Sequence, residues 1–465
     1  MSSWSRWEIP PELVRKAEEI ETEVRPYFER VAAIREYNQL KVLAAMQEAH
    51  ISESFFGGTT GYGYDDSGRA RLERAYAHAF GAEAALVRPQ ISTGTHALAV
   101  TFFAITRPGH KILSVTGAPY DTLHDVIGIR RDERTREHRL KLEMRGLRRS
   151  ETEMSAGRRE KVPLTPGSLR DWGVDYKQVD LLPDGNLDFS VIEAALSEQP
   201  EVVFVQRSRG YHDRPAVTID VMRELVRLTR RCSPDSIIFV DNCYGEFVER
   251  DEPTEVGVDI CAGSLNKNPG GGRAVTGGYI VGRNDLVLAA SNRLYAPGLG
   301  RAVGPSLGTT RDFSQGLYLA PQVVAEAIKG MIFSSAFFRS LGWHTNPAPD
   351  AIRADIIQSI ECGSRERLIA LCQAVQAASP VDSLVVPVPG SMPGYDCEII
   401  MAAGSFTQGS SIELSADGPL RPPYIAYMQG GLAYEQVKLA VLLTYKALTS
   451  GSESADGNET SEIVL

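Results

Sequence analysis

The feature that most constrains the fold is an alternation of short apolar runs and helical segments between residues 84 and 282. The apolar runs read AALVRPQI, KILSV, EVVFVQ, SIIFVD and TGGYIVG. Several of them lead into a polar turn and then into a stretch with helical periodicity. This order is typical of an α/β domain. In such domains ligands bind beyond the carboxyl ends of the strands, so the turns after these runs are where we expect the functional residues.

Length and composition narrow the class of protein further. With 465 residues, 43% of them hydrophobic and 23% charged, the chain can form two or three domains with large cores. The net charge of -10 argues against a general nucleic-acid-binding protein. The six cysteines form no CxxC pair and the eight histidines form no HExxH cluster, so we expect neither a disulfide framework nor a metal site. We also expect no membrane span or signal peptide, and a cytoplasmic protein.

The remaining segments suggest less regular structure. Helical spacing over residues 11–49 predicts one or two amphipathic helices. The Arg- and Glu-rich stretch from 130 to about 166 is either a charged surface helix or a mobile insertion, and a partner-binding arm is the less favoured alternative. The last 16 residues, 450–465, are polar and predicted to be disordered. The elements expected near the C-terminus are candidate strands at 381–388, 398–402 and 411–414, and a closing helix at 434–449.

A lysine in a glycine-rich loop is the first candidate for chemistry. Residues 262–278 read AGSLNKNPGGGRAVTGG, with Lys267 between two asparagines and three glycines just after them. Most lysines in such loops lie in solvated turns. A partly desolvated lysine, however, has a lowered pKa and a nucleophilic amine, as a Schiff base with an aldehyde cofactor requires.

Three earlier positions favour the catalytic alternative, although each also has a structural explanation. The turn Thr93-Gly94-Thr95 precedes an apolar helix, and such a helix start either caps itself or binds phosphate. Tyr120 follows a strand, where it can face a ligand or pack in the core. Asp241 ends a continuous apolar strand, so its carboxylate needs a cationic partner, such as a pyridinium nitrogen.

Long segments in the same order resemble the methionine gamma-lyase-like family, often described as aluminium-resistance proteins, among the fold type I enzymes that use pyridoxal 5'-phosphate (PLP). The segments read EYNQLKVLAAMQ, TTGYGYDDSGR, GAPYDTL, VQRSRGY, VDNCYGEFVERDEPTEVG, SLNKNPGGG, SMPGY and SSIELSADGPLRPPY. They span most of the chain outside the charged stretch and the tail. The resemblance implies an aspartate-aminotransferase-like α/β fold, with a large mixed-sheet α/β/α domain and a smaller C-terminal α+β domain.

The resemblance also implies a division of the chain. Residues 1–68 would form an N-terminal helical segment and an inter-subunit loop. Residues 69–330 would form the PLP-binding domain, with the charged insertion at about 130–166. Residues 331–449 would form the small domain, followed by the disordered tail at 450–465.

The family's catalytic and cofactor-binding roles carry over to matching positions. Lys267 would form the Schiff base with PLP and move protons at Cα and Cβ. Asp241 would pair with the pyridinium nitrogen. Tyr120 would stack on the ring and act as an acid or base towards a leaving group.

The resemblance also implies phosphate, substrate and subunit contacts. The amides of Gly94 and Thr95 and the hydroxyls of Thr93 and Ser264 would hold the phosphate. The substrate α-carboxylate would bind to Arg421 or, as a second candidate, to Arg209. Tyr62 or Tyr64 would reach the phosphate bound in a neighbouring subunit. The expected assembly is a dimer at least, and a homotetramer by analogy with relatives.

We therefore expect a PLP-dependent lyase that performs γ- or β-elimination on an L-amino acid. The leaving group would be a thiol, a thioether-derived thiol or a halide, the last giving an unsaturated or alkynyl amino acid. Asn266 stands where most relatives carry an aliphatic residue, which suggests a specialised pathway. The alternatives are γ-replacement, aldol cleavage or transamination in the same fold, and a non-catalytic metal-resistance or regulatory protein.

Overall fold

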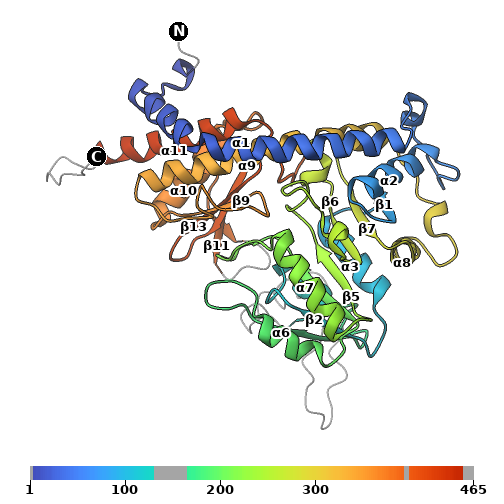
Figure 1. Ribbon diagram of the computed structural model, residues 1–465. Helices are drawn as coiled ribbons and strands as arrows, with labels where there is room; N and C mark the ends of the chain where they lie inside the picture. The colour runs from blue at the N-terminus through green and yellow to red at the C-terminus, as the bar shows by residue number, and fades with distance from the viewer. Residues whose placement is uncertain (1–3, 130–164, 392–396, 454–465) are drawn as a thin grey trace, which may run out of the picture.

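The computed structural model describes residues 4–129, 165–391 and 397–453, and within them the chain forms two β-sheets (Figure 1). The larger sheet has the order β1-β7-β6-β5-β4-β2-β3. Its strands from β3 to β6 are parallel, and β7 is antiparallel to both of its neighbours. The strands are β1 (Ala84–Arg88), β2 (Lys111–Ser114), β3 (Asp175–Gln178), β4 (Val202–Gln206), β5 (Ile237–Asp241), β6 (Ile260–Ser264) and β7 (Gly278–Gly282).

Helices cover both faces of this sheet, because alternate strand residues point to opposite sides. Leu86 and Phe204 belong to the apolar cluster that contains α3, whereas their neighbours Val87 and Val203 belong to the cluster on the other face. The helices of this part are α2 (Ser67–Ala79), α3 (Gly94–Ile105), α4 (Asp121–Ile127), α6 (Phe189–Leu196), α7 (Ile219–Cys232) and α8 (Asn284–Leu294).

The smaller sheet is antiparallel, with the order β10-β11-β12-β13-β9-β8. Its strands are β8 (Thr345–Asn346), β9 (Ile357–Glu361), β10 (Gly390–Ser391), β11 (Glu398–Ala403), β12 (Ser415–Pro419) and β13 (Ile425–Gln429). Helix α10 (Arg365–Ala377) packs against β11 and β12, and α11 (Tyr434–Glu453) packs against α10.

Two long helices connect the sheets. Helix α1 (Pro11–Glu48) runs along one side of the molecule beside α9 (Thr310–Ser340) (Figure 1). The buried side of α1 carries residues at helical spacing: Leu13, Ala17, Ile20, Val24, Val31, Asn38, Val42 and Ala45. Short 3₁₀ helices complete the fold at η1 (Ser5–Trp7), η2 (Glu53–Gly57), η3 (Pro253–Val256), η4 (Asn268–Gly270) and η5 (Gly300–Ala302).

The fold class expected from the sequence is confirmed, but two candidate strands are wrong. Residues 381–388 form no strand, and Leu384, Val385 and Val386 are exposed. Pro387 in this segment and Pro389 just after it lack the N–H groups that a ladder needs. The strand expected at 411–414 begins at Ser415, because β11 ends at Ala403, the residue that pairs with Ser415.

Other expectations concern the extent of the long helices, the charged stretch, the tail and membrane spans. Residues 11–48 form the single helix α1. Helix α9 spans residue 330, the end of the PLP-binding domain that the resemblance implies, and that division into domains stays a prediction. Most of the charged stretch (130–164) and most of the tail (454–465) lie outside the described residues. Within the described residues, no helix has both the length and the apolar character to cross a membrane.

Candidate active site

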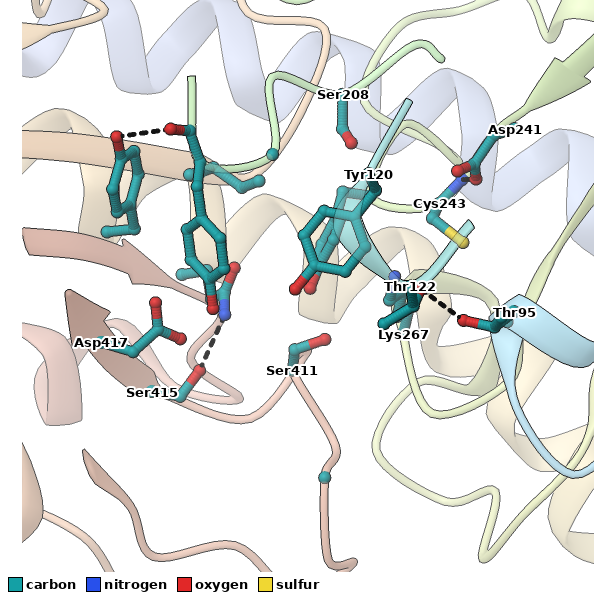
Figure 2. Close-up of a pocket in the computed structure, with 18 of the residues that line it drawn as sticks. Thr95, Tyr120, Thr122, Ser208, Asp241, Cys243, Lys267, Ser411, Ser415 and Asp417 are labelled. Carbon is teal, nitrogen blue, oxygen red and sulfur yellow. Dashed lines mark hydrogen bonds between the residues drawn. The ribbon is translucent and has the colours of Figure 1, made fainter. Parts of the chain in front are cut away.

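A cavity of about 310 Å³ opens between the two sheets, at the carboxyl ends of β4, β5 and β6. The large sheet and its turns supply Tyr120, Asp241 and Lys267 to its lining, and the small sheet supplies Asp417 and Gln429. Figure 2 shows Asp241 and Cys243 on one side of this cavity and Asp417 and Ser415 on the other. The site lies where ligands bind in parallel α/β sheets.

Lys267 is the third residue after β6 and the N-cap of η4, and its loop is fixed to the loop after β5. The Asn268 side-chain amide donates to the carbonyl oxygens of Tyr244 (3.0 Å) and Glu246 (2.9 Å). The Lys267 Nζ lies 4.0 Å from the centroid of the Tyr244 ring. Buried hydrogen bonds from one asparagine therefore hold the lysine against the end of β5.

The electrostatics of Lys267 differ from the sequence-based expectation. Burial lowers the pKa of its amine, but the acidic groups around it, Asp241 among them, outweigh burial and raise that pKa above its ordinary value. The expected lowering of the pKa is wrong for this arrangement, because the sequence did not reveal how many acidic groups face the amine.

Asp241 is the last residue of β5, and its side chain is buried as predicted. The Cys243 backbone amide donates to its carboxylate over 3.1 Å. Burial raises the pKa of Asp241, while the nearby Lys267 ammonium opposes that rise. The carboxylate is thus held in place, in a setting that favours a further cationic partner.

The predicted phosphate turn begins helix α3. The Thr93 hydroxyl accepts a hydrogen bond from the His96 amide (3.0 Å) and so caps the helix. Gly94 and Thr95 form the first turn and line the cavity. A Cβ added at Gly94 would lie 3.3 Å from the Cys243 Sγ and 3.4 Å from the Ser264 Cβ. Glycine therefore lets this helix end approach the ends of β5 and β6 closely.

Tyr120 precedes α4 and lines the same cavity. Its backbone amide donates to the Gln206 side-chain oxygen over 2.6 Å, which ties it to the end of β4. Its ring centroid lies 5.7 Å from that of Tyr211. The aromatic residue expected at a strand end thus faces the site.

The other predicted residues are not among the described residues that line the cavity. Thr93 directly precedes the lining residue Gly94, and the Ser264 hydroxyl accepts a hydrogen bond from the Asn266 amide (3.1 Å). Arg421 is exposed in the turn after β12, and Arg209 is buried and pairs with Asp355 (3.4 Å). Neither arginine is among the described residues that line the cavity.

The exposed tyrosines of the glycine-rich loop also lie outside the cavity of their own chain. Tyr62 and Tyr64 are 74% and 56% exposed, and their rings stack with centroids 5.6 Å apart. Their expected contact with a neighbouring subunit therefore remains a prediction.

Sequence reasoning missed several lining residues. Tyr244 and Cys243 follow Asp241 closely, so their proximity along the chain was an available signal. Tyr211, Asp417 and Tyr427 come from distant segments. The segments VQRSRGY and SSIELSADGPLRPPY contain Tyr211 and Asp417, but nothing in their local pattern indicated that these side chains meet.

The described residues fit PLP. A buried carboxylate (Asp241) is available for a pyridinium nitrogen, and an amine (Lys267) for an aldehyde. The close approach of Gly94 to Cys243 and Ser264 places a helix N-terminus, which favours phosphate, at the ends of the two strands that precede these groups. Tyr120 adds an aromatic ring to the same cavity.

Comparisons with known proteins agree with this arrangement. A family model described as methionine gamma-lyase matches residues 13–160 and 156–449. The uncharacterized protein YnbB of Bacillus subtilis is 45% identical over 431 residues, which cover 92% of this chain and 95% of that protein. A carbon-sulfur lyase involved in aluminium resistance from Clostridium novyi is 42% identical, with a TM-score of 0.84 over 96% of this chain and 98% of that one.

A more distant structure shares the fold. The PLP-dependent protein YhfS from Escherichia coli is 16% identical, with a TM-score of 0.57, and the match covers 90% of this chain and 97% of that one.

Proposed function

The chain belongs to the methionine gamma-lyase family of PLP-dependent enzymes, and on that premise we propose that it eliminates a heteroatom group from Cγ or Cβ of an L-amino acid. One observation carries the proposal. Lys267 and Asp241 lie at the ends of the neighbouring strands β6 and β5 and line one cavity with the first turn of α3. An amine, a buried carboxylate and a helix N-terminus together are what a PLP lyase requires.

Bound PLP supplies the electron sink that stabilises negative charge at the substrate's Cα. In our proposal the Lys267 Nζ, as a neutral amine, accepts the Cα proton and moves protons at Cβ, because it is the one amine among the described lining residues. The Asp241 carboxylate balances the charge of the ring nitrogen. Tyr120, fixed by Gln206, positions the ring.

The substrate's α-carboxylate needs a cationic partner from outside this lining. We assign it to Arg421, an exposed arginine in the turn after β12, because a guanidinium forms a bidentate pair with a carboxylate. Arg209 is the second candidate, but its Nε already faces Asp355 and its guanidinium donates to the Asn346 carbonyl (2.8 Å).

The leaving group distinguishes ordinary from specialised metabolism. A thiol or thioether would place the enzyme in sulfur amino-acid metabolism, and a halide would give an unsaturated or alkynyl amino acid. Asn266 supports the specialised alternative, because its buried side-chain oxygen has no hydrogen-bond partner among the described residues, directly before Lys267. We infer that this position differs in polarity from the aliphatic residue expected in most relatives.

We also propose that each active site is shared between subunits of a dimer or tetramer. The stacked, exposed rings of Tyr62 and Tyr64 support this proposal, because their loop is anchored while the rings face outward. The Gly304 amide donates to the Tyr62 carbonyl (3.0 Å), and Arg69 donates to the Gly63 carbonyl (2.8 Å).

The visible absorbance spectrum of the purified protein tests the proposal first. We expect a band from Lys267-bound cofactor, which borohydride reduction fixes onto the peptide that contains Lys267. Lys267→Ala should lose the band and the covalent label while it keeps the wild-type circular dichroism. Incubation with thioether and halogenated amino acids should then release ammonia with a keto acid or an unsaturated product. A protein that takes up no PLP would contradict the proposal.

A further inference from the structure

The cavity contains a second buried carboxyl group that the proposed function does not use. Asp417 lies on β12 with 5% of its surface exposed and lines the same cavity as Lys267. Figure 2 shows it across the cavity from Asp241, on the side formed by the small sheet. Lys267 and Asp241 mark the cofactor side, so a substrate's side chain has room to extend towards Asp417.

The hydrogen bonds of Asp417 are incomplete. The Tyr211 hydroxyl bonds to the carboxyl group, but the Asp417 Oδ1 is buried without a hydrogen-bond partner among the described residues. A buried, unpaired carboxylate oxygen is costly unless it is protonated or receives a donor from a ligand. Burial accordingly raises the pKa of Asp417 to about 7, near the value at which a carboxyl group both gives and takes protons at neutral pH.

Among the described residues, the surroundings of Asp417 hold it in place and supply no cation that acts on its carboxyl group. The titratable groups around it are Tyr211 after β4, Tyr244 after β5, Tyr427 on β13 and Cys372 on α10. The Tyr427 hydroxyl donates to the Tyr211 carbonyl (2.8 Å). Asp417 pairs with Tyr427 in the ladder between β12 and β13. A group on a paired strand is positioned more rigidly than one on a loop.

We propose that Asp417 is a second catalytic residue, the acid that protonates the heteroatom leaving from the substrate's side chain. The proposal rests on the proposed elimination. As the carbon–heteroatom bond breaks, its electron pair leaves with the heteroatom. The O–H bond of Asp417 breaks, a heteroatom–H bond forms, and the carboxylate regains a proton from water before the next turnover. Basic leaving groups such as alkanethiolates need this proton, whereas acetate and halides leave without it.

The test compares leaving groups in the PLP-loaded enzyme. Two substrates with the same carbon skeleton are used, one losing an alkanethiolate (an S-alkyl amino acid) and one losing acetate (an O-acetyl amino acid). For Asp417→Asn we expect kcat to fall about 10²–10⁴-fold with the alkanethiolate and less than about tenfold with acetate. Asp417→Glu should restore part of the difference.

Two results would overturn the assignment of Asp417 as the acid. An equal loss with both leaving groups would mean that Asp417 only supports the structure. A leaving-group-dependent loss in Tyr120→Phe, without one in Asp417→Asn, would give the role to Tyr120. If the wild-type enzyme eliminates neither group, the proposed function itself fails, which separates that outcome from failure of the Asp417 assignment alone.

A second measurement does not depend on activity. Infrared spectra recorded between pH 5 and 9, with those of the Asp417→Asn protein subtracted from those of the wild type, should contain a protonated-carboxyl band that disappears near pH 7. Bands of other buried carboxyl groups, such as Glu246, are present in both proteins and cancel in this difference. A carboxylate that is fully ionised at pH 5 could not donate the proton, and the proposal would then be wrong.

Discussion

Buried acidic side chains surround the end of β5, and their partners differ. Glu252 is buried beside Arg207, which also pairs with Glu249 (2.8 Å). Glu246 faces instead the Tyr279 hydroxyl, which donates to it over 2.7 Å, and its other oxygen has no hydrogen-bond partner among the described residues. Burial raises the pKa of Glu246 to about 8. A pKa of about 8 favours the neutral, protonated form of Glu246 at neutral pH.

This protonation predicts a pH-dependent stability. The folded pKa lies above the ordinary value of 4.5, so the contribution is fully present below about pH 4.5 and is lost as the pH rises through about 8. Glu246→Gln mimics the neutral form. We expect the variant to match the wild type near pH 5 and to exceed its unfolding free energy by on the order of a few kcal/mol at pH 9.

Thermal or denaturant unfolding at pH 5, 7 and 9 measures this difference. Glu198→Gln is the control, because Glu198 is exposed and pairs with Lys177 (2.7 Å), and its hydrogen bond and ion pair with Lys177 hold its pKa below the ordinary value. That control should show no gain at pH 9. An equal pH dependence for Glu246→Gln and the wild type would mean that Glu246 is ionised in the folded protein.

At the scale of elements, the lysine loop is built by close contact with helix α9. A Cβ added at Gly270 in η4 would lie 1.7 Å from the Leu265 carbonyl oxygen, and one added at Gly316 in α9 would lie 2.3 Å from the Gly270 carbonyl oxygen. Glycine at position 316 allows η4 to lie against α9, and glycine at position 270 allows the loop to fold back onto Leu265. The position of Lys267 therefore depends on backbone contacts as well as on Asn268.

Gly270→Ala should displace this loop. Because the clash involves backbone atoms, we expect a loss of about 1–3 kcal/mol of stability or more, together with weaker PLP binding. Gly57→Ala is the matched control, since a Cβ there meets no atom within 4 Å. PLP titration followed by absorbance, with parallel thermal unfolding, compares the two. Wild-type PLP affinity in Gly270→Ala would contradict the dependence of Lys267 on this contact.

At the scale of the whole molecule, the site lies at the junction of the two sheets, and α1 and α9 connect the parts that form it (Figure 1). On the outside, Tyr62 and Tyr64 form an exposed aromatic pair on an anchored loop. Exposed aromatic side chains of this kind are common at protein interfaces. Their proposed role in a neighbouring subunit's site can be tested with mixed oligomers.

Two inactive variants should complement each other if the sites are shared. We expect Lys267→Ala and the double variant Tyr62→Ala/Tyr64→Ala to be nearly inactive alone. Co-expressed, they should recover about a quarter of wild-type activity, because half of randomly assembled dimers would contain one intact site. Activity assays on the co-expressed mixture measure the recovery, and hybrids purified from it by two different tags should show about half of wild-type activity. No recovery in confirmed hybrids would mean that each chain completes its own site.

The sequence alone determined those features that depend on residues close together along the chain. Apolar runs and turns predicted the α/β class, and the strand-end positions of Asp241, Tyr120 and Lys267 followed from those runs. The Thr93 cap was also a local signal. Parallel strands bring their carboxyl ends to one edge, so local pattern and a general rule of sheet geometry sufficed.

Only the tertiary structure decided the other side of the site. The ladder between β11 and β12 fixes where β12 begins. The ladder between β12 and β13 then places Asp417 opposite Tyr427. The burial of Asp417 and Glu246, and the raised pKa of Lys267, depend on groups that approach from distant segments. Burial and electrostatic interactions are set by distances in space, which the local sequence pattern does not contain.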